Sequence, residues 1–413
     1  MFRIRRAKVE DVATLLKLAR MVHFINLPPD REIITHKVVH SRNGFLRVAD
    51  RRARPEPEPI PAAVAEIGRR LDENSDGKVL AGYGTSTIES DLFMFVLEDL
   101  ESGGVLGTSQ TVTRMGGPGN PNVSLKLEER SFFSKSLQTG TSHTVATMHL
   151  DESGPTEIGG LILQPSYRGH KLKLGRFLSL VRFHFMGLHR RRFADRVLAE
   201  MMAAITPEGE SVLWDYLGRR FVPLSYEEAD RFCQYSREFI TSLLPREGIY
   251  LSLLPPVARA SIAEVGKETI PARKMLEKLG FTYSGQIDPF DGGPYLDCET
   301  DEIAPVKSTC RVELAKAAAA SRLKGRAIVS LLHDDGEFYA IDEACAFDNQ
   351  GRLLISEQSA ELLKADAGAT VGYTPYRPDS PEPPASARRK PAAKRERKKT
   401  TKKAAKKAAK RSA

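Results

Sequence analysis

The chain has 413 residues, of which 41% are hydrophobic and 28% are charged. These values are ordinary for a globular protein, and the length suits about two domains. No run approaches the roughly 18 apolar residues that span a bilayer, and the N-terminus lacks the apolar stretch of a secretory signal. The four cysteines stand without CxxC spacing, which argues against a zinc site or a disulfide framework. We therefore expect a cytoplasmic protein that binds no metal.

The positive charge is concentrated at the C-terminus. The whole chain carries a formal charge of +9, but residues 388–413 hold 14 Lys and Arg against one acid, so the rest is mildly acidic. Such a tail predicts non-specific electrostatic contact with nucleic acid, since it has no aromatic residues for stacking on bases. A solubilising tail with no partner is an equally good interpretation.

The first part of the chain predicts a strand at Phe2–Arg5 and then a helix. Apolar residues recur there at helical spacing, at Val12, Leu15, Leu16 and Ala19. An exposed insertion is expected around 54–59, because this Pro- and Glu-rich stretch cannot form a regular hydrogen-bond ladder. Two apolar runs, 93–97 and 105–109, flank a turn with two glycines and predict a hairpin.

Strands and helices alternate through the middle of the chain. Strands are expected at Ile158–Leu163, Arg196–Met201 and Phe281–Ser284, and helices at Leu174–Leu188, 213–219 and 271–279. Trp214, the only tryptophan, is expected in the core. This order favours an α/β or α+β fold with a mixed central sheet. We expect a body at 1–305, a small β-rich domain at 306–376 with turns at 334–336 and 349–351, and a disordered tail at 377–413.

The segment 160–177 is the most informative one for function. A strand leads through a basic, glycine-containing turn into a helix, so unpaired backbone N–H groups and the helix dipole can together bind a pyrophosphate. The edge of that strand can pair with an extended amide-bearing arm such as pantetheine. The alternative is an exposed strand–turn–helix with solvated charges. Candidate cofactor-binding residues are Leu161, Ile162, Leu163, Arg168, Gly169, Lys171, Gly175 and Arg176.

Several blocks carry a resemblance to known families. The opening segment and the turn at 167–176 resemble the first strand and the acyl-CoA loop of GNAT acyltransferases. More narrowly, dispersed blocks over roughly 2–375 resemble arginine N-succinyltransferase in order and spacing, which implies an insertion in this chain at about 47–88. They are 95–99, 197–201, 213–221, 229–233, 271–281 and Phe290-Asp291-Gly292-Gly293-Pro294.

This resemblance implies a GNAT-like fold and a direct acyl transfer without metal or permanently bound cofactor. Succinyl-CoA would be the co-substrate and the α-amino group of arginine the acceptor, in arginine breakdown. Leu161 stands at the family's succinyl-CoA-binding leucine. The resemblance also implies an oligomer, formed with further copies or with a paralogue.

The chain departs from the family pattern in the acceptor region. Gly266 stands where the family has its proposed proton-donating histidine, and the adjacent Lys267 and Glu268 are candidate replacements. A His-Thr-Gly stretch reads Glu-Ser-Gly at 152–154, and the family's aromatic-rich segment has no aromatic residue at 120–126. The pyrophosphate loop is also about two residues longer than the family pattern.

Glu157 and Glu200 are candidates for the general base or for binding a guanidinium group, which a carboxylate can pair bidentately. Tyr250 is a candidate acid for the leaving thiolate. Surface or capping roles for the two acids, and core packing for the tyrosine, are the alternatives.

Two other functions stay open at this point. The chain could be an acyl-CoA-binding regulatory protein of the same fold, as the missing histidine suggests. It could also acylate another amine, such as ornithine or a polyamine.

Overall fold

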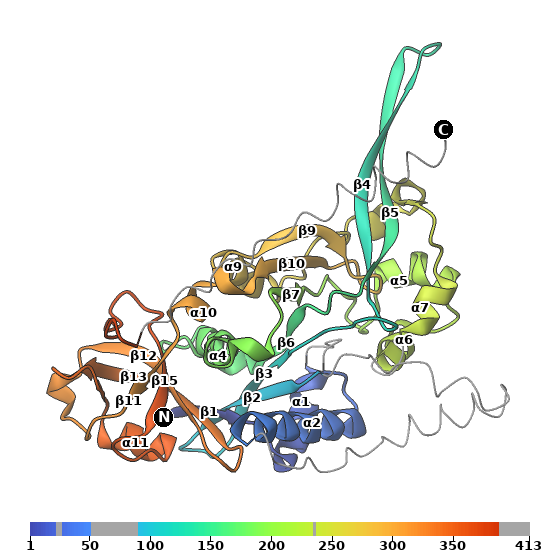
Figure 1. The fold of residues 1–413 in the computed structure, drawn as a ribbon. Coiled ribbons are helices and arrows are strands. Elements are labelled where there is room, and N and C mark those ends of the chain that lie inside the picture. The colour runs from blue at the N-terminus through green and yellow to red at the C-terminus, as the bar shows by residue number, and fades with distance from the viewer. Residues whose placement is uncertain (22–26, 51–89, 234–236, 388–413) are drawn as a thin grey trace, which may run out of the picture.

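The computed structural model describes residues 1–21, 27–50, 90–233 and 237–387. One continuous mixed sheet runs through the molecule, with helices packed against its body (Figure 1). The strands of the body are, in spatial order, β1 (Phe2–Arg6), β2 (Leu92–Asp99), β3 (Val105–Val112), β6 (Thr156–Leu163), β7 (Arg196–Glu200), β10 (Pro294–Glu299) and β9 (Thr282–Ile287). The predicted strands, the hairpin of β2 and β3 and the α/β class are confirmed.

The pair β6–β7 differs from its neighbours in the sheet. It pairs in parallel, whereas the other strand pairs in the described residues run antiparallel. Its register holds only at Thr156 opposite Val197 and Glu157 opposite Leu198, near the start of each strand. Beyond these positions the two strands separate, which opens a gap in the sheet.

Helices α1 (Val12–Arg20) and α4 (Leu174–Leu188) lie on opposite faces of the sheet. Because side chains alternate along a strand, Phe93 and Phe95 of β2 point into the core with α4, whereas Met94 points into the core with α1. Both predicted helices are confirmed, and α4 has the predicted bounds.

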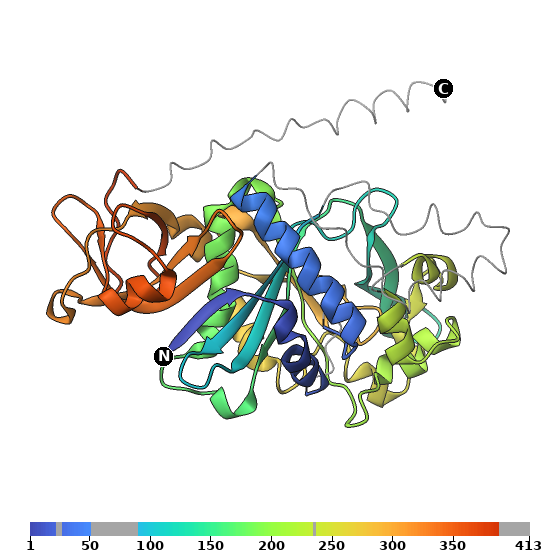
Figure 2. The ribbon, with the colours of Figure 1, turned by 90° about the horizontal axis from the view of Figure 1, so that it is seen from below.

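Helix α2 (Arg31–Ala49) was not predicted, and it crosses the end of β2 (Figure 2). A Cβ atom at Gly44 would lie 2.7 Å from the carbonyl oxygen of Leu92, so glycine permits this close crossing. Asp30 caps the helix, because its carboxylate accepts from the N–H groups of Glu32 and Ile33. The expected insertion overlaps the end of α2, and its residues 51–88 lie outside the described part of the chain.

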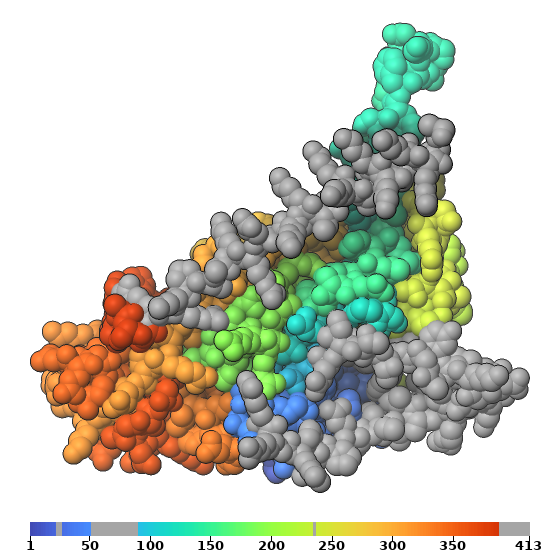
Figure 3. Space-filling model, in the orientation of Figure 1, coloured from blue at the N-terminus to red at the C-terminus, as the bar shows by residue number. Residues whose placement is uncertain are grey.

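A long hairpin, β4 (Asn122–Ser134) and β5 (Thr139–Asp151), projects from the body (Figures 1 and 3). Its base is held by pairing of β4 with β9 at Leu125 and Lys126 and of β5 with β8 (Ile249–Tyr250). Its outer half is exposed on both faces, and three exposed apolar residues lie near its tip: Phe132, Phe133 and Leu137. This hairpin was not predicted from the sequence.

Short helices complete the body, and the last of them packs against α4. They are α5 (Val212–Tyr216), α6 (Tyr226–Cys233), α7 (Glu238–Leu243), α8 (Pro256–Arg259), α9 (Ile270–Glu277) and α10 (Ala304–Ser308). Trp214 is fully buried and stacks on Phe290 with ring centroids 5.0 Å apart, which confirms its expected place in the core. The predicted helix at 213–219 consists of α5 and a following turn of 3-10 helix.

The C-terminal region is rich in strands, as predicted, and has its own hydrophobic cluster. It comprises β11 (Cys310–Glu313), β12 (Gly325–Leu332), β13 (Phe338–Phe347), β14 (Leu353–Leu354), α11 (Glu357–Leu363) and β15 (Thr370–Thr374). Turns at 334–336 and 349–351 connect its strands as expected. It extends the sheet of the body, because β13 pairs with β1.

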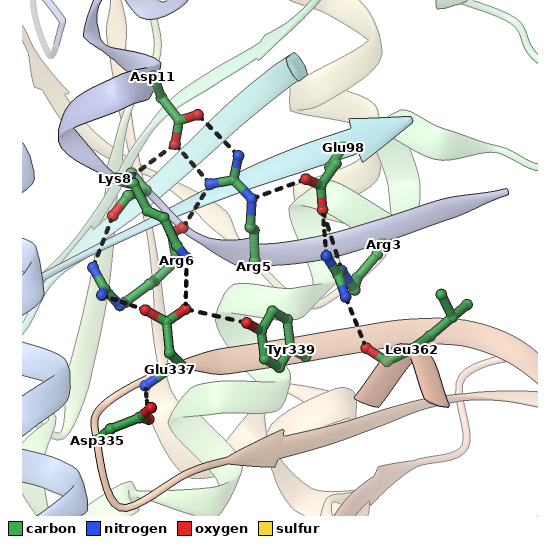
Figure 4. Close-up of polar contacts among 11 residues, drawn as sticks. Arg3, Arg5, Arg6, Lys8, Asp11, Glu98, Asp335, Glu337, Tyr339 and Leu362 are labelled. Atoms are coloured by element: carbon green, nitrogen blue, oxygen red, sulfur yellow. Dashed lines mark hydrogen bonds and ion pairs between the residues drawn. The ribbon is translucent and has the colours of Figure 1, made fainter. Parts of the chain in front are cut away.

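Charged side chains reinforce this junction (Figure 4). Arg3 donates to Glu98 at 2.9 Å and to the carbonyl of Leu362 at 3.1 Å. Arg6 and Lys8 both pair with Glu337 in the C-terminal region. The β-rich region is therefore fixed to the first strand of the body by backbone pairing and by ion pairs.

Residues 377–387, which belong to the expected disordered tail, contact the β-rich region. Arg377 donates to Asp342 at 2.5 Å, and Ser380 donates to the carbonyl of Arg326 at 2.5 Å. The basic segment 388–413 lies outside the described residues. Among the helices that the structure describes, none combines the length and the apolar character needed to cross a membrane.

Candidate active site

A bulge in β6 lies where this strand has separated from β7. Thr108 pairs with Ile162 and Gln110 with Gly159, so the single residue between them on β3 faces both Gly160 and Leu161. Gly160 has φ of +55°, a left-handed conformation that glycine adopts easily. The bulge turns backbone groups of β6 toward the gap, so an extended amide-bearing molecule could pair with the strand there.

The turn after β6 forms a cradle of backbone N–H groups. Gly169 has φ of +74° and Lys173 has φ of +55°, and α4 begins directly afterwards at Leu174. In the described part of the chain, the N–H groups of Gly169, Lys171, Leu174 and Gly175 donate to no protein group. Four free donors at the N-terminus of a helix suit a pyrophosphate.

The basic side chains of this turn have different surroundings. Lys171 is exposed, whereas Arg168 pairs with Glu268. Arg176 donates to the carbonyl of Tyr376 at 3.0 Å and lies 5.0 Å above its ring. The structure thus places the predicted donor-binding residues of β6, the turn and α4 along one continuous path. Of the three basic side chains, Arg176 is held by the C-terminal region.

A cavity of about 190 Å³ lies on the α1 face of the sheet, beside the start of the gap. Glu157 and Glu200 both line it, so the structure brings these two sequence candidates together. The other lining residues come from α2, β3, β4, β10 and the α6–α7 region, and include Lys37, Gln110, Asn122, Cys233, Arg237, Asp288, Phe290 and Tyr295.

Hydrogen bonds connect the polar residues of this cavity. Arg237 donates to Oδ1 of Asn122 at 2.7 Å, and Nδ2 of Asn122 donates to Glu200 at 3.1 Å. The hydroxyl of Tyr295 lies 3.3 Å from Oδ2 of Asp288. Asn122 belongs to the segment that departs from the family pattern, so this departure changes the cavity wall.

The cavity is rich in buried acids. Burial, together with the negative charges of Asp291 and Glu200, raises the pKa of Asp288 well above its usual range. Burial raises the pKa of Asp291 to about 6, and burial raises the pKa of Asp230 behind the cavity to about 8. Raised pKa values mean that burial favours the neutral form of these carboxyl groups, and a cation bound beside them would favour their ionised form.

The block 290–294 shapes the end of this cavity. Asp291 accepts from the N–H groups of Ala203 at 2.9 Å and Gly293 at 2.7 Å, which ties the loop to the chain just after β7. A Cβ atom at Gly293 would lie 1.8 Å from the carbonyl oxygen of Met201, so this close approach needs glycine. The residues of this block that resemble the family pattern therefore hold the loop against the chain after β7.

Three sequence candidates do not line the cavity. Tyr250 lies in β8, with its ring 6.3 Å from that of Phe132 on the hairpin. Lys267 is exposed, and Glu268 is the partner of Arg168 at the donor loop. Their catalytic roles stay predictions, but their positions favour Glu157 and Glu200 as the groups that meet an acceptor.

Sequence reasoning missed Lys37, Arg237 and Asp288. Lys37 lies in an unpredicted helix, and Arg237 lies four residues after the block at 229–233 without belonging to a motif. Asp288 had a usable signal, because it stands two residues before the block at 290–294.

A separating parallel strand pair, a bulge on its first strand and a turn with free N–H groups that leads into a helix are the features of an acyl-CoA-dependent N-acyltransferase with a GNAT-like fold. The family model described as "Arginine N-succinyltransferase beta subunit" matches residues 64–305. The chain belongs to the arginine N-succinyltransferase family.

Individual relatives agree with this assignment. Arginine N-succinyltransferase of Enterobacter sp. (strain 638) is 31% identical over 317 residues, which cover 76% of this chain and 88% of the relative. The enzyme of the same name from Photorhabdus laumondii is 33% identical over 66% of this chain and 79% of its own. Among solved structures, arginine/ornithine succinyltransferase subunit AI from Pseudomonas aeruginosa matches with a TM-score of 0.68 and 26% identity, over 90% of this chain and 98% of that one.

Proposed function

We propose that this enzyme transfers the succinyl group of succinyl-CoA to the α-amino group of arginine. The observation that carries the proposal is the acid-lined cavity, which contains Glu157 and Glu200 and adjoins the gap between β6 and β7. A guanidinium group fits such acids, because planar N–H donors pair bidentately with carboxylates. The names of the relatives support the same donor and acceptor.

The donor is proposed to lie along β6 and the turn that follows it. The free N–H groups of Gly169, Lys171, Leu174 and Gly175 would bind the pyrophosphate, with Arg168 and Arg176 adding positive charge. Leu161–Leu163 would line the pantetheine arm, and the bulge would present backbone N–H groups to the thioester carbonyl.

Glu157 is the proposed general base. It takes one proton from the acceptor's ammonium, and the neutral amine then attacks the thioester carbon. The carbonyl oxygen becomes an oxyanion, which backbone N–H groups at the bulge stabilise. When the intermediate collapses, the C–S bond breaks and the second proton of the nitrogen passes to the thiolate. One proton is released overall, and the products are the succinyl amide and CoA.

Thiol release from succinyl-CoA with arginine, ornithine and a panel of amines tests this function directly. We expect turnover that is fastest with arginine. Faster turnover with ornithine or a polyamine would contradict arginine as the acceptor, whereas the proposed acyl transfer from succinyl-CoA would still hold.

An acyl-CoA-binding regulatory protein is the second candidate, because Gly266 stands where the family has a histidine. Gly266 has little room for a larger side chain, since its Cβ would lie 3.0 Å from the carbonyl oxygen of Ala203. Binding of succinyl-CoA without thiol release with any amine would favour this candidate.

Location and partners are proposals as well. We infer a cytoplasmic enzyme that assembles with further copies or with a paralogue, which the description of the Pseudomonas relative as a subunit supports. Light scattering of the purified chain tests the assembly.

The tail at 388–413 is proposed to bind polyanions weakly, so truncation after residue 387 would remove any salt-sensitive DNA binding.

A further inference from the structure

Two basic side chains share the acidic cavity. Lys37 reaches it from α2, and Arg237 reaches it from the segment before α7. They lie close enough to influence each other: burial lowers the pKa of Lys37, the negative charges of Glu157 and Asp230 oppose this effect, and the charge of Arg237 adds to it. Two like charges that face one small cavity repel each other, and an anion between them would relieve this repulsion.

Neither cation is neutralised by direct contact with a protein carboxylate. In the described part of the chain, no carboxylate oxygen lies within 4.0 Å of the Lys37 ammonium or the Arg237 guanidinium. The side-chain contacts of Arg237 include Oδ1 of Asn122 at 2.7 Å and Sδ of Met115 at 3.4 Å, both uncharged.

Arg237 nevertheless keeps its positive charge. Burial opposes its ionisation, but the negative charges of Glu200 and Glu157 nearby raise its pKa above the usual value. A fixed guanidinium beside a cavity is the preferred protein group for a carboxylate ligand, since the two can form paired hydrogen bonds.

We infer that Arg237, with Lys37 beside it, binds the α-carboxylate of the acceptor and restricts this enzyme to amino acids. The inference rests on the proposed acyl transfer to arginine and adds a requirement for the carboxylate. Glu200 and Asp288 then face the guanidinium end of the acceptor, and Glu157 faces its α-amino group. Because the carboxylate and the amine share one carbon atom, holding the carboxylate also fixes the position of the nucleophile.

The wild-type protein tests this inference without any substitution. Agmatine has the amine and the guanidinium of arginine but no carboxylate, and L-argininamide keeps the stereocentre without the negative charge. We expect both to bind at least about 100-fold more weakly than L-arginine, because each leaves buried cations without a partner. Calorimetry with CoA present measures binding even if no acyl transfer occurs, so this outcome is independent of the proposed function. Agmatine binding within about threefold of arginine would overturn the inference.

Substitution of Arg237 tests the residue itself. In Arg237→Met the affinity for arginine should fall, while that for agmatine stays unchanged or rises, so the preference for arginine should drop at least about tenfold. Arg237→Lys should keep part of the preference, because it retains the charge and loses the paired geometry. Arg231→Met is the matched control, since Arg231 is exposed on α6 and pairs with Glu227.

Two results with these variants would reject the assignment. Equal weakening of arginine and agmatine would show that Arg237 only supports the cavity wall. The variant could instead keep its preference for arginine over agmatine and lose part of its preference for succinyl-CoA over butyryl-CoA. That result would assign the two cations to the carboxylate of the donor. If Arg237→Met fails to fold, the comparison of ligands on the wild-type protein still decides whether the carboxylate is recognised.

Discussion

Glu157 and Glu200 project from the same face of the central sheet, although one lies on β6 and the other on β7. Glu157 pairs opposite Leu198, and Glu200 follows Leu198 by two positions on the same face of β7. Both line the cavity beside the gap between these strands. The parallel register therefore places two carboxylates at one cavity, the proposed acceptor site, next to the strand proposed to hold the donor.

Removing the proposed base should affect chemistry more than binding. We expect Glu157→Gln to slow turnover by roughly 10²–10⁴-fold, the usual contribution of a positioned proton acceptor, with little change in KM for succinyl-CoA. Steady-state thiol release measures both the turnover rate and KM. Glu152→Gln, at an exposed acid in the turn after β5, is the control. A loss of less than about threefold would reject Glu157 as the base.

A carboxylate at Gly175 should block the donor site. The Cβ of a residue there would lie 3.6 Å from Cδ2 of Leu163, an ordinary contact, so Gly175→Asp should fold. Its charge would stand at the N-terminus of α4 and repel the pyrophosphate, so we expect at least about a 100-fold loss of CoA affinity.

Gly368→Asp provides the matched control for this variant. Gly368 lies in the C-terminal region with φ of +89°, and a Cβ atom there would have no other atom within 4 Å. Aspartate tolerates this left-handed conformation better than most residues. Unchanged CoA affinity in Gly175→Asp, by calorimetry, would show that the donor loop has been placed wrongly.

The ion pair between Arg168 and Glu268 should contribute little. Both side chains are more than a third exposed, at 40% and 69%, and such pairs are worth about 0.2–1 kcal/mol. We expect Glu268→Gln to change KM for succinyl-CoA by less than about fivefold and to leave the turnover rate unchanged. Turnover slowed by about 100-fold or more, on the order of a general acid's contribution, would instead support the catalytic role expected from the sequence.

His184 should make the protein sensitive to acid. It is buried, with its ring nitrogens 2.5 Å from Oγ1 of Thr374 and 2.6 Å from Oγ of Ser330, so it links α4 to the β-rich region. Burial lowers its pKa to about 3, with smaller effects of His189 and Arg311. Its folded pKa therefore lies below the unfolded value of about 6.5.

The unfolded chain protonates His184 more readily than the folded protein does. The contribution of His184 to the free energy of unfolding should therefore be complete above about pH 6.5 and should fall as pH decreases toward 3. In His184→Gln the slope of unfolding free energy against pH in that range should decrease by up to about 1.4 kcal/mol per pH unit. Urea unfolding at several pH values measures this slope. Burial also lowers the pKa of His189 to about 3, so part of the pH dependence of the unfolding free energy should remain in the variant. An identical slope in both proteins would contradict a neutral buried His184.

The strand, turn and helix of the proposed donor site were largely predictable because they are local. The segment from Leu161 to Arg176 is continuous in sequence, and its strand, turn and helix follow from short-range preferences of the backbone. The same holds for the α4 helix, whose bounds match the prediction. Glycine at 169 and the basic residues near it already indicated a phosphate-binding turn.

The acceptor cavity could be predicted only in part. Glu157 and Glu200 were identified as candidates, but Lys37, Arg237 and Asp288 come from three separate segments. No sequence pattern brings these segments together, because their proximity depends on how α2, β10 and the α6–α7 region pack. For the same reason, the sequence offered Tyr250 and Lys267 as candidates although they lie elsewhere.

The amino-acid sequence by itself determined the family, the α/β class and the donor loop, since these depend on local backbone geometry and on the order of dispersed blocks along one chain. The tertiary structure decided which charges meet in the acceptor cavity and that the β-rich region extends the sheet through β13 and β1. Charge interactions act between groups a few ångströms apart in space. Only the packing of distant segments sets those distances, so the chemistry of the acceptor site arises only in the folded molecule.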